Sequence, residues 1–297
     1  MELANHLNDR LLFAVPKEGR LYEKCVELLR GSDIQFRRSS RLDIALCTNL
    51  PLALVFLPAA DIPTFVGEGK CDLGITGIDQ VQESDVDVIP LLDLNFGKCK
   101  LQIQVPENGD LKEPKQLIGK EIVSSFTSLT TRYFEQLEGV KPGEPLKTKI
   151  KYVGGSVEAS CALGVADAIV DLVESGETMK AAGLIDIETV LSTSAYLISS
   201  KHPQHPELMD TIKERIEGVL TAQKYVLCNY NAPRGNLPQL LKLTPGKRAA
   251  TVSPLDEEDW VGVSSMVEKK DVGRIMDELK KQGASDILVF EISNCRA

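Results

Sequence analysis

Histidine is scarce in this chain of 297 residues, which holds only His6, His202 and His205. No Ser-His-Asp catalytic set is evident, so a mechanism that depends on a histidine base is disfavoured. His202 and His205 are each followed by a proline. We therefore expect an exposed linker at these positions rather than a metal site.

Paired cysteines, long apolar runs and an excess of basic residues are also missing. The seven cysteines form no C-x-x-C pair, which favours reduced thiols in the cytosol. No apolar run approaches the roughly 18 residues of a membrane span, and the N-terminus lacks the pattern of a signal peptide. We expect a cytoplasmic protein without a membrane span. The net charge of −9 argues against a general nucleic-acid binder.

Two common nucleotide-binding motifs are absent as well. The stretch from Gly67 to Lys70 is followed by Cys71 rather than Ser or Thr, and its spacing does not fit a P-loop. No G-x-G-x-x-G follows an expected strand. Any ATP bound here is therefore expected to be a substrate recognised through its base. An acidic protein must hold polyphosphates with local amides, a few Lys or Arg side chains and metal ions.

The length indicates two or three domains, and the first two thirds alternate strands with helices, as α/β folds do. Strands of a first lobe are expected at 11–15, 52–57 and 71–75, and a helix at 20–30. Strands of a second lobe are expected at 100–105, 121–124, 149–153 and 168–170. Strands at 188–191 and 195–198 are expected to return to the first lobe, before a helix at 207–224.

The last 73 residues have a different pattern. Strands at 225–230, 249–254, 260–267 and 285–293, with helices at 236–243 and 271–282, give the order βαββαβ of a ferredoxin-like domain. The pattern shows packing faces and no chemistry. From the residues alone, this domain could equally stabilise the protein or assemble it into oligomers.

The run from Gly155 to Met179 carries the strongest functional signal. An apolar strand at 168–170 leads to Asp171 and Glu174, and then to the turn 175–178 that opens a helix. Free amides at a helix start can bind a phosphate, while carboxylates can accept hydrogen bonds from sugar hydroxyls or meet a hydrated Mg²⁺. The turn alone also fits an ordinary strand-to-helix connection capped by Ser175.

The spacing of Glu158, Gly164, Asp171 and the turn residues resembles the signature of the ATP phosphoribosyltransferases. The stretches 17–21, 41–42, 72–77 and 96–101 resemble further sequence motifs of that family and occur in the same order as in the family. The stretch 283–289 resembles a motif of its long form. The resemblance implies two periplasmic-binding-protein-like lobes with a cleft between them, and a C-terminal ferredoxin-like regulatory domain. Lobe I would comprise 1–95 with 186–224, lobe II 96–185 and the regulatory domain 225–297.

The resemblance also implies a reaction, namely condensation of ATP with phosphoribosyl pyrophosphate as the first step of histidine biosynthesis. Its further implications are Mg²⁺ as cofactor, feedback inhibition by histidine, and homo-oligomers in which dimers build hexamers. No residue is assigned as a general base, because adenine N1 already has a free lone pair. The implied contacts to phosphoribosyl pyrophosphate are Glu158, Asp171, Glu174, Ser175, Gly176, Glu177 and Thr178, with Glu158 and Asp171 also near Mg²⁺. The implied contacts to ATP are Lys17, Gly19, Arg20, Arg41, Asp72, Gly74, Thr76 and Lys100.

Two other functions remain open at this stage. A two-lobed effector-binding regulator would need a DNA-binding segment, and no basic helix-turn-helix is visible. A phosphoribosyltransferase that acts on a free base would commonly carry two adjacent acidic residues before the turn. Here Asp171 and Glu174 are separated by Leu172 and Val173.

Overall fold

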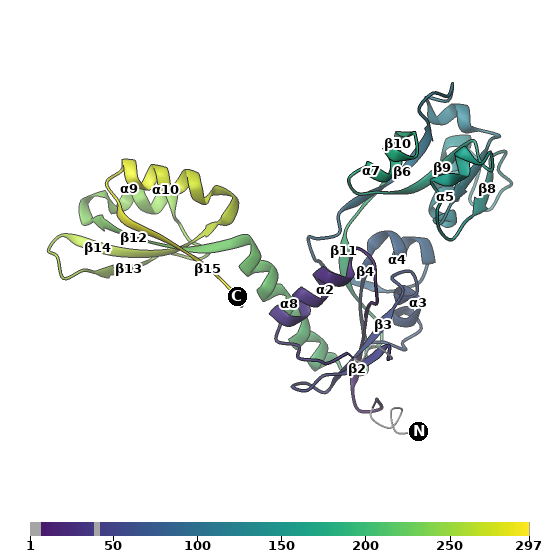
Figure 1. Ribbon diagram of the computed structural model, residues 1–297. Coiled ribbons are helices and arrows are strands. Elements are labelled where there is room, and N and C mark those ends of the chain that lie inside the picture. Colours follow the sequence, from purple (N-terminus) through teal and green to yellow (C-terminus); the bar gives the residue numbers. More distant parts are fainter. Residues whose placement is uncertain (1–6, 39–41, 297) are drawn as a thin grey trace. The chain divides into compact units, whose positions relative to one another are not determined.

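The computed structural model describes residues 7–38 and 42–296. The chain divides into two compact units, Met1–Val26 with Phe36–Met209, and Glu27–Gln35 with Asp210–Ala297. The second unit therefore begins before the expected domain start at 225, and it also takes in a short segment from near the N-terminus. The expected α/β architecture is confirmed (Figure 1).

Lobe I of the first unit is built on a six-stranded sheet. The strand order is β2 (Ile44–Leu46), β3 (Leu52–Leu57), β1 (Leu11–Pro16), β4 (Leu73–Gly77), β11 (Ala195–Ser199) and β5 (Ile89–Asp93). The central strands are buried on both faces, as the apolar run of β1 requires, and they pair in parallel. β2 and β11 run antiparallel to their neighbours.

Lobe II is built on a five-stranded sheet in the order β10 (Leu184–Thr193), β6 (Cys99–Pro106), β9 (Ala168–Val173), β7 (Glu121–Ser124) and β8 (Lys149–Tyr152). The expectation that the strand at 188–191 returns to lobe I is wrong. That segment belongs to β10, which pairs antiparallel with β6 from Leu184 to Thr193, with two register shifts on the way. The return to lobe I occurs only after Ser194, where β11 begins.

Short helices connect the strands of the first unit. Helix α2 (Tyr22–Gly31) buries the expected stripe, because Leu21, Cys25, Leu28 and Leu29 are each at most 4% exposed. The other helices are α3 (Ile62–Gly67), α4 (Ile78–Ser84), α5 (Thr127–Glu138), α6 (Ala159–Ala162) and α7 (Glu177–Ala181), with a 3₁₀ turn at Pro114–Leu117.

The second unit contains the expected ferredoxin-like domain, in which one four-stranded antiparallel sheet has the order β13 (Thr251–Pro254), β14 (Trp260–Glu268), β12 (Tyr225–Pro233) and β15 (Ser285–Glu291). Helices α9 (Leu237–Leu243) and α10 (Val272–Lys281) follow 3₁₀ turns at Arg234–Asn236 and Lys269–Asp271, and they cover one face of the sheet (Figure 1). Burial alternates along β12 and β14 because only that face is covered.

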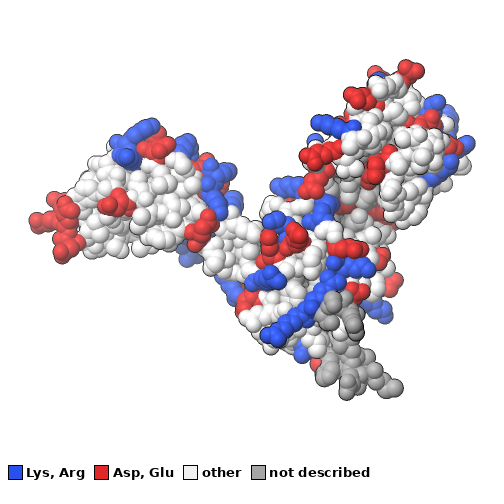
Figure 2. Space-filling model, in the orientation of Figure 1, with Lys and Arg blue, Asp and Glu red and all other residues white. Residues whose placement is uncertain are grey.

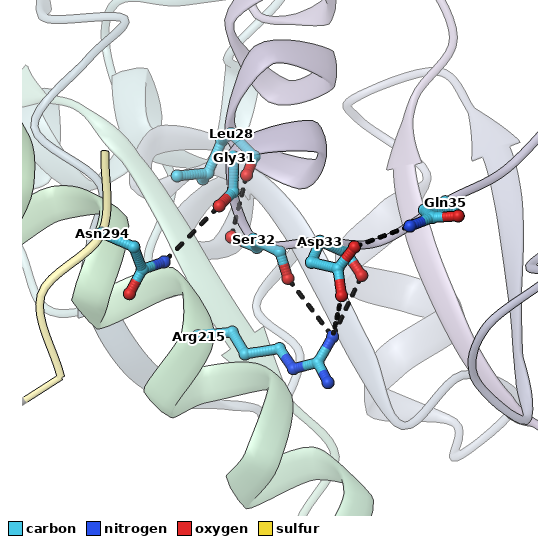
Figure 3. A network of polar contacts seen from close by, with 7 residues as sticks. All are labelled: Leu28, Gly31, Ser32, Asp33, Gln35, Arg215 and Asn294. Carbon is cyan, nitrogen blue, oxygen red and sulfur yellow. Dashed lines mark hydrogen bonds and ion pairs between the residues drawn. The ribbon is translucent and has the colours of Figure 1, made fainter.

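Helix α8 (Pro206–Lys224) precedes this domain and matches the expected helix at 207–224. Arg215 on α8 donates to the backbone oxygens of Ser32 and Asp33, and its guanidinium lies 3.6 Å from the Asp33 carboxylate (Figure 3). Asn294 donates to the backbone oxygen of Gly31. These contacts attach the segment 27–35 to the second unit.

No helix among the described residues is long and apolar enough to cross a membrane. All seven cysteines are free thiols. On the face drawn in Figure 2, acidic and basic side chains are interspersed over both units.

Candidate active site

The smaller of two adjoining cavities in the first unit, of about 260 Å³, collects the residues of the 155–179 run. Its wall is formed by Arg20, Cys99, Gln104, Glu158 and the continuous stretch from Asp171 to Met179. Lobe I contributes Arg20, and lobe II contributes the acidic residues and the turn. All seven residues expected to contact phosphoribosyl pyrophosphate therefore lie around one cavity.

The turn at the end of β9 provides backbone amides rather than a strong helix dipole. Ala168, Ile169 and Val170 are fully buried and anchor the strand, and the chain then turns at Gly176, whose φ is +79°. This left-handed backbone suits glycine. The Ser175 hydroxyl accepts a hydrogen bond of 3.4 Å from the Glu177 amide. Because α7 has only five residues, its dipole is smaller than that of a longer helix.

Asp171 is a partly buried acidic residue of this cavity. Burial raises the pKa of its carboxyl group and the nearby Glu158 carboxylate raises it further, while a hydrogen bond from the Leu172 amide acts in the opposite direction. That bond is 2.8 Å long. A carboxylate whose own charge is poorly solvated gains most from hydroxyl donors or a cation brought by a ligand.

Arg20 brings positive charge from lobe I into the same cavity. Its Nη1 donates a hydrogen bond of 2.5 Å to the backbone oxygen of Gly97, in the segment that connects β5 to β6. The guanidinium is thus held against the crossing between the lobes. Its remaining donors suit a phosphate, which arginine can bind in a bidentate manner.

The larger cavity, of about 710 Å³, adjoins the smaller one and shares Cys99 and residues 173–176 and 179 with it. Three lysines line it, namely Lys98, Lys100 and Lys180, together with the Tyr196 ring and Asp93 and Asp186. Cations beside an aromatic ring suit a ligand that combines polyphosphate with a flat base. The two cavities together can therefore hold a phosphorylated sugar next to a nucleotide.

Comparison with known proteins agrees with this chemistry. The family model for ATP phosphoribosyltransferase matches residues 58–218, and the model for the C-terminal domain of that family matches residues 222–294. The ATP phosphoribosyltransferase of Yarrowia lipolytica is 74% identical over 296 residues, and that of Saccharomyces cerevisiae is 68% identical over 297, with both chains of each pair covered completely. The chain belongs to the ATP phosphoribosyltransferase family. It is a pentosyltransferase of histidine biosynthesis.

A solved ATP phosphoribosyltransferase structure shares the fold of this chain. The HisG:HisZ complex from Thermotoga maritima superimposes with a TM-score of 0.60 at 24% identity, and the match covers 70% of this chain and 96% of that one. The resemblance noted from the sequence is thus confirmed at the level of family and fold.

Only some of the residues expected to bind ATP line the two cavities, whereas all seven expected contacts to phosphoribosyl pyrophosphate line the smaller one. Arg20 lines the smaller cavity and Lys100 the larger one. Lys17, Gly19, Asp72, Gly74 and Thr76 line neither, and Arg41 lies outside the described residues. The ATP contacts of all eight residues stay a prediction.

Asp72 and Thr76 have structural partners instead. The Asp72 carboxylate accepts hydrogen bonds from the amides of Leu12 and Gln204, and the Thr76 hydroxyl donates to the backbone oxygen of Ala59 at 2.7 Å. Both side chains are buried. The bonds to Asp72 join the start of β4 to β1 and to the segment after β11, and the bond from Thr76 joins β4 to the connection between β3 and α3.

Sequence reasoning identified Lys100 on β6 but missed Gln102 and Gln104, the other polar residues that this strand places in the cavities. Lys100, Gln102 and Gln104 occupy one face of this strand, and the two glutamines are only 5% and 2% exposed. Gln102 donates to Asp186 at 3.0 Å and to Thr189 at 3.1 Å. Polar residues at every second position of a strand between apolar ones were the available signal. From the sequence alone, such residues look the same on a solvent-exposed face of a sheet as on a face that another part of the protein covers.

Proposed function

We propose that this member of the family transfers the phosphoribosyl group of phosphoribosyl pyrophosphate to N1 of ATP. The N1 lone pair forms a bond to the anomeric carbon of the sugar, and the bond from that carbon to pyrophosphate breaks with its electrons leaving on pyrophosphate. The products are N1-(5-phospho-ribosyl)-ATP and pyrophosphate. The observation that carries the proposal is the single cavity around Arg20, Glu158 and residues 171–179.

In this proposal each part of the cavity has one task. The amides and hydroxyls of Ser175, Gly176, Glu177 and Thr178 hold the 5-phosphate. Asp171 and Glu158 accept hydrogen bonds from the ribose hydroxyls, with Glu174 at the edge shared with the larger cavity. Such contacts are tasks of positioning and electrostatics. They need no general base, because the attacking nitrogen carries no proton.

The acidic pair also fits Mg²⁺ that enters with the pyrophosphate group. Residues 7–38 and 42–296 contain no cluster of three or more His, Cys, Asp or Glu side chains able to hold a metal. Two protein carboxylates, Asp171 and Glu158, match an ion that keeps water and phosphate oxygens as its other ligands. When bound, Mg²⁺ offsets the negative charge of the leaving group.

The direct test is an absorbance assay for a new chromophore when the purified protein meets ATP, phosphoribosyl pyrophosphate and Mg²⁺. Product should form with ATP and not with adenine. Asp171→Ala should lower turnover by more than ~100-fold, the effect of losing roughly 2.7 kcal/mol of transition-state binding. Near-normal turnover of this variant, or product from adenine alone, would contradict the proposal.

We further propose that histidine inhibits the enzyme by binding to the C-terminal domain. Support comes from a cavity of about 330 Å³ beside its sheet, whose lining includes Asn229, Asn231 and Asp286. Amides and a carboxylate suit the ammonium and imidazole groups of an amino acid. Histidine added to the full chain should slow hydrogen exchange in β12 and β14. Protection confined to the first unit would place the effector elsewhere.

A cytoplasmic location and a homo-oligomeric assembly of dimers and hexamers complete the proposal. Fluorescence imaging of the tagged protein tests the location. Analytical ultracentrifugation across a range of concentrations tests the assembly.

A further inference from the structure

The two lobes of the first unit are connected by the chain at two crossings. Residues 94–98 link β5 to β6, and Ser194 links β10 to β11. A third connection is non-covalent and joins α4 of lobe I to α5 of lobe II. Glu83, in the last turn of α4, is its centre.

Glu83 supplies the cap that α5 lacks. The residue before this helix is Phe126, whose side chain has no hydrogen-bond acceptor. Instead, one carboxylate oxygen of Glu83 accepts a hydrogen bond of 2.8 Å from the Ser128 amide, and the other accepts one of 2.9 Å from the Leu129 amide. A carboxylate here satisfies free amides and faces the positive end of the helix dipole.

Because Glu83 belongs to lobe I and α5 to lobe II, this cap connects the two lobes as well as stabilising the helix. N-caps are ordinarily supplied by the residue that begins the helix. Glu83 lies 45 residues before Ser128 in the chain. Both of its oxygens are engaged at short distances, so a rotation of one lobe against the other would break both hydrogen bonds.

The opposite end of α4 is fixed to a crossing between the lobes. The Thr193 hydroxyl donates to the Asp79 carboxylate at 2.6 Å, and the Ile78 amide donates to the backbone oxygen of Ser194 at 3.0 Å. Asp79 is fully buried. Helix α4 is therefore hydrogen-bonded to the crossing at its first turn and to the start of α5 at its last turn. Three residues at the crossing end also line the larger cavity, namely Ile78, Thr193 and Ser194.

A second, more exposed contact lies one turn further along α5. Arg132 donates to the backbone oxygen of Gln82, and its guanidinium lies 3.6 Å from the carboxylate of Asp85. The Asp85 side chain is 85% exposed. An ion pair so open to water contributes little on its own, which makes Asp85 a useful control for Glu83.

We propose that Glu83 is a positioning residue that fixes the angle between the lobes at which both bind one substrate. Arg20 of lobe I and the turn at Gly176 of lobe II face the same cavity. The sequence predicts Arg20 as an ATP contact, but its place in this cavity lets its guanidinium also pair with a phosphate of phosphoribosyl pyrophosphate, provided that the lobes keep this angle. The inference rests on the proposed function, because its readout is the affinity for phosphoribosyl pyrophosphate. Once bound, that substrate can itself draw the lobes together, so the loss of Glu83 affects binding more than turnover.

Steady-state kinetics of Glu83→Gln test this, with Asp85→Asn as the matched control. Each change removes one negative charge at the end of α4, but only the first also replaces one of the two acceptor oxygens of the cap with an NH2 group, which cannot accept from an amide. In Glu83→Gln the KM for phosphoribosyl pyrophosphate should rise about tenfold, as expected when one charge-assisted hydrogen bond is lost, while kcat stays within about threefold. Asp85→Asn should leave both values within about twofold of the unsubstituted enzyme.

The measurements are made well below the melting temperature of each variant, where a helix cap that only stabilises α5 would leave KM unchanged. An unchanged KM in Glu83→Gln, or an equal rise in Asp85→Asn, overturns the inference. If Glu83→Gln does not fold, Glu83→Asp carries the same test, because it keeps the charge but withdraws both acceptor oxygens from the Ser128 and Leu129 amides by one methylene; the KM should again rise several fold. Failure of the unsubstituted enzyme to form product would instead contradict the proposed function, so the two failures are distinguishable.

Discussion

Gly97 offers a quantitative test of how the crossing between the lobes holds Arg20. Its φ of +64° lies in the left-handed region, and a Cβ at this position would lie 2.3 Å from the Cδ2 atom of Leu21, a side chain only 4% exposed. Substitution by alanine carries the left-handed penalty of roughly 1–2 kcal/mol. Crowding of the packed Leu21 side chain adds about 1–3 kcal/mol. We therefore expect Gly97→Ala to lose about 2–5 kcal/mol of unfolding free energy.

Gly119→Ala is the matched control for this change. Gly119 has a φ of +82°, but a Cβ added there would meet no atom within 4 Å, so only the left-handed penalty applies. Urea denaturation should give a loss of about 1–2 kcal/mol for Gly119→Ala, clearly smaller than that for Gly97→Ala. Because Arg20 donates to the Gly97 oxygen, Gly97→Ala should also raise the KM for phosphoribosyl pyrophosphate, whereas Gly119→Ala should not.

Equal losses of stability in the two variants, with an unchanged KM in both, would refute this reasoning. That result would mean that Leu21 moves aside without cost and that Arg20 does not depend on the backbone at residue 97.

Three further predictions concern single charged side chains. Burial raises the pKa of Asp171, so ionisation of this carboxyl group at neutral pH lowers the stability of the folded chain. Asp171→Asn should therefore raise the melting temperature at pH 7, and this gain should vanish below pH 3.8, where the carboxyl group is protonated in both the folded and the unfolded chain. Burial alone would raise the pKa of Glu138, but hydrogen bonds from the Thr148 hydroxyl and from the amides of residues 147 and 148 leave it lowered. Glu138→Gln should therefore reduce stability at pH 7, and the deficit should shrink as the pH falls below 4.5 in a melting series. Arg215→Met removes the contacts to Ser32 and Asp33 and should lower the free energy of unfolding by about 1–3 kcal/mol, seen as faster hydrogen exchange in α8. Hydrogen exchange at the rate of the unsubstituted chain would mean that those contacts contribute nothing to stability.

The fold was largely predictable because its signals are local. The short apolar run 52–57 forms the buried strand β3, as predicted, and the stripe on α2 marks the buried face of that helix. The partner of a strand is not a local property. β10 carries alternating polar and apolar residues that would suit either sheet, so its pairing with β6 could not be read from residues 184–193 alone.

The candidate site likewise combines residues that are close in the sequence, which could be predicted, with distant ones, which could not be predicted from local patterns. The seven residues of the 155–179 run were found because most of them follow one another in the chain. Arg20 joins them from more than 130 positions away, and only the family resemblance pointed to it. Nothing near Glu83 in the sequence marks it, since its partner lies 45 residues further along. The alternation along β6 marks Gln104 as polar but does not show its partner, which lies 67 residues further along.

The attachment of residues 27–35 to the second unit has a practical consequence for anyone who dissects this protein. A fragment that starts at residue 210 leaves Arg215 and Asn294 without the backbone oxygens that they contact. The complementary N-terminal fragment keeps residues 27–35 but loses the Arg215 and Asn294 side chains that contact their backbone oxygens. Independent expression of residues 210–297 should therefore succeed best when a linker fuses residues 27–35 to them.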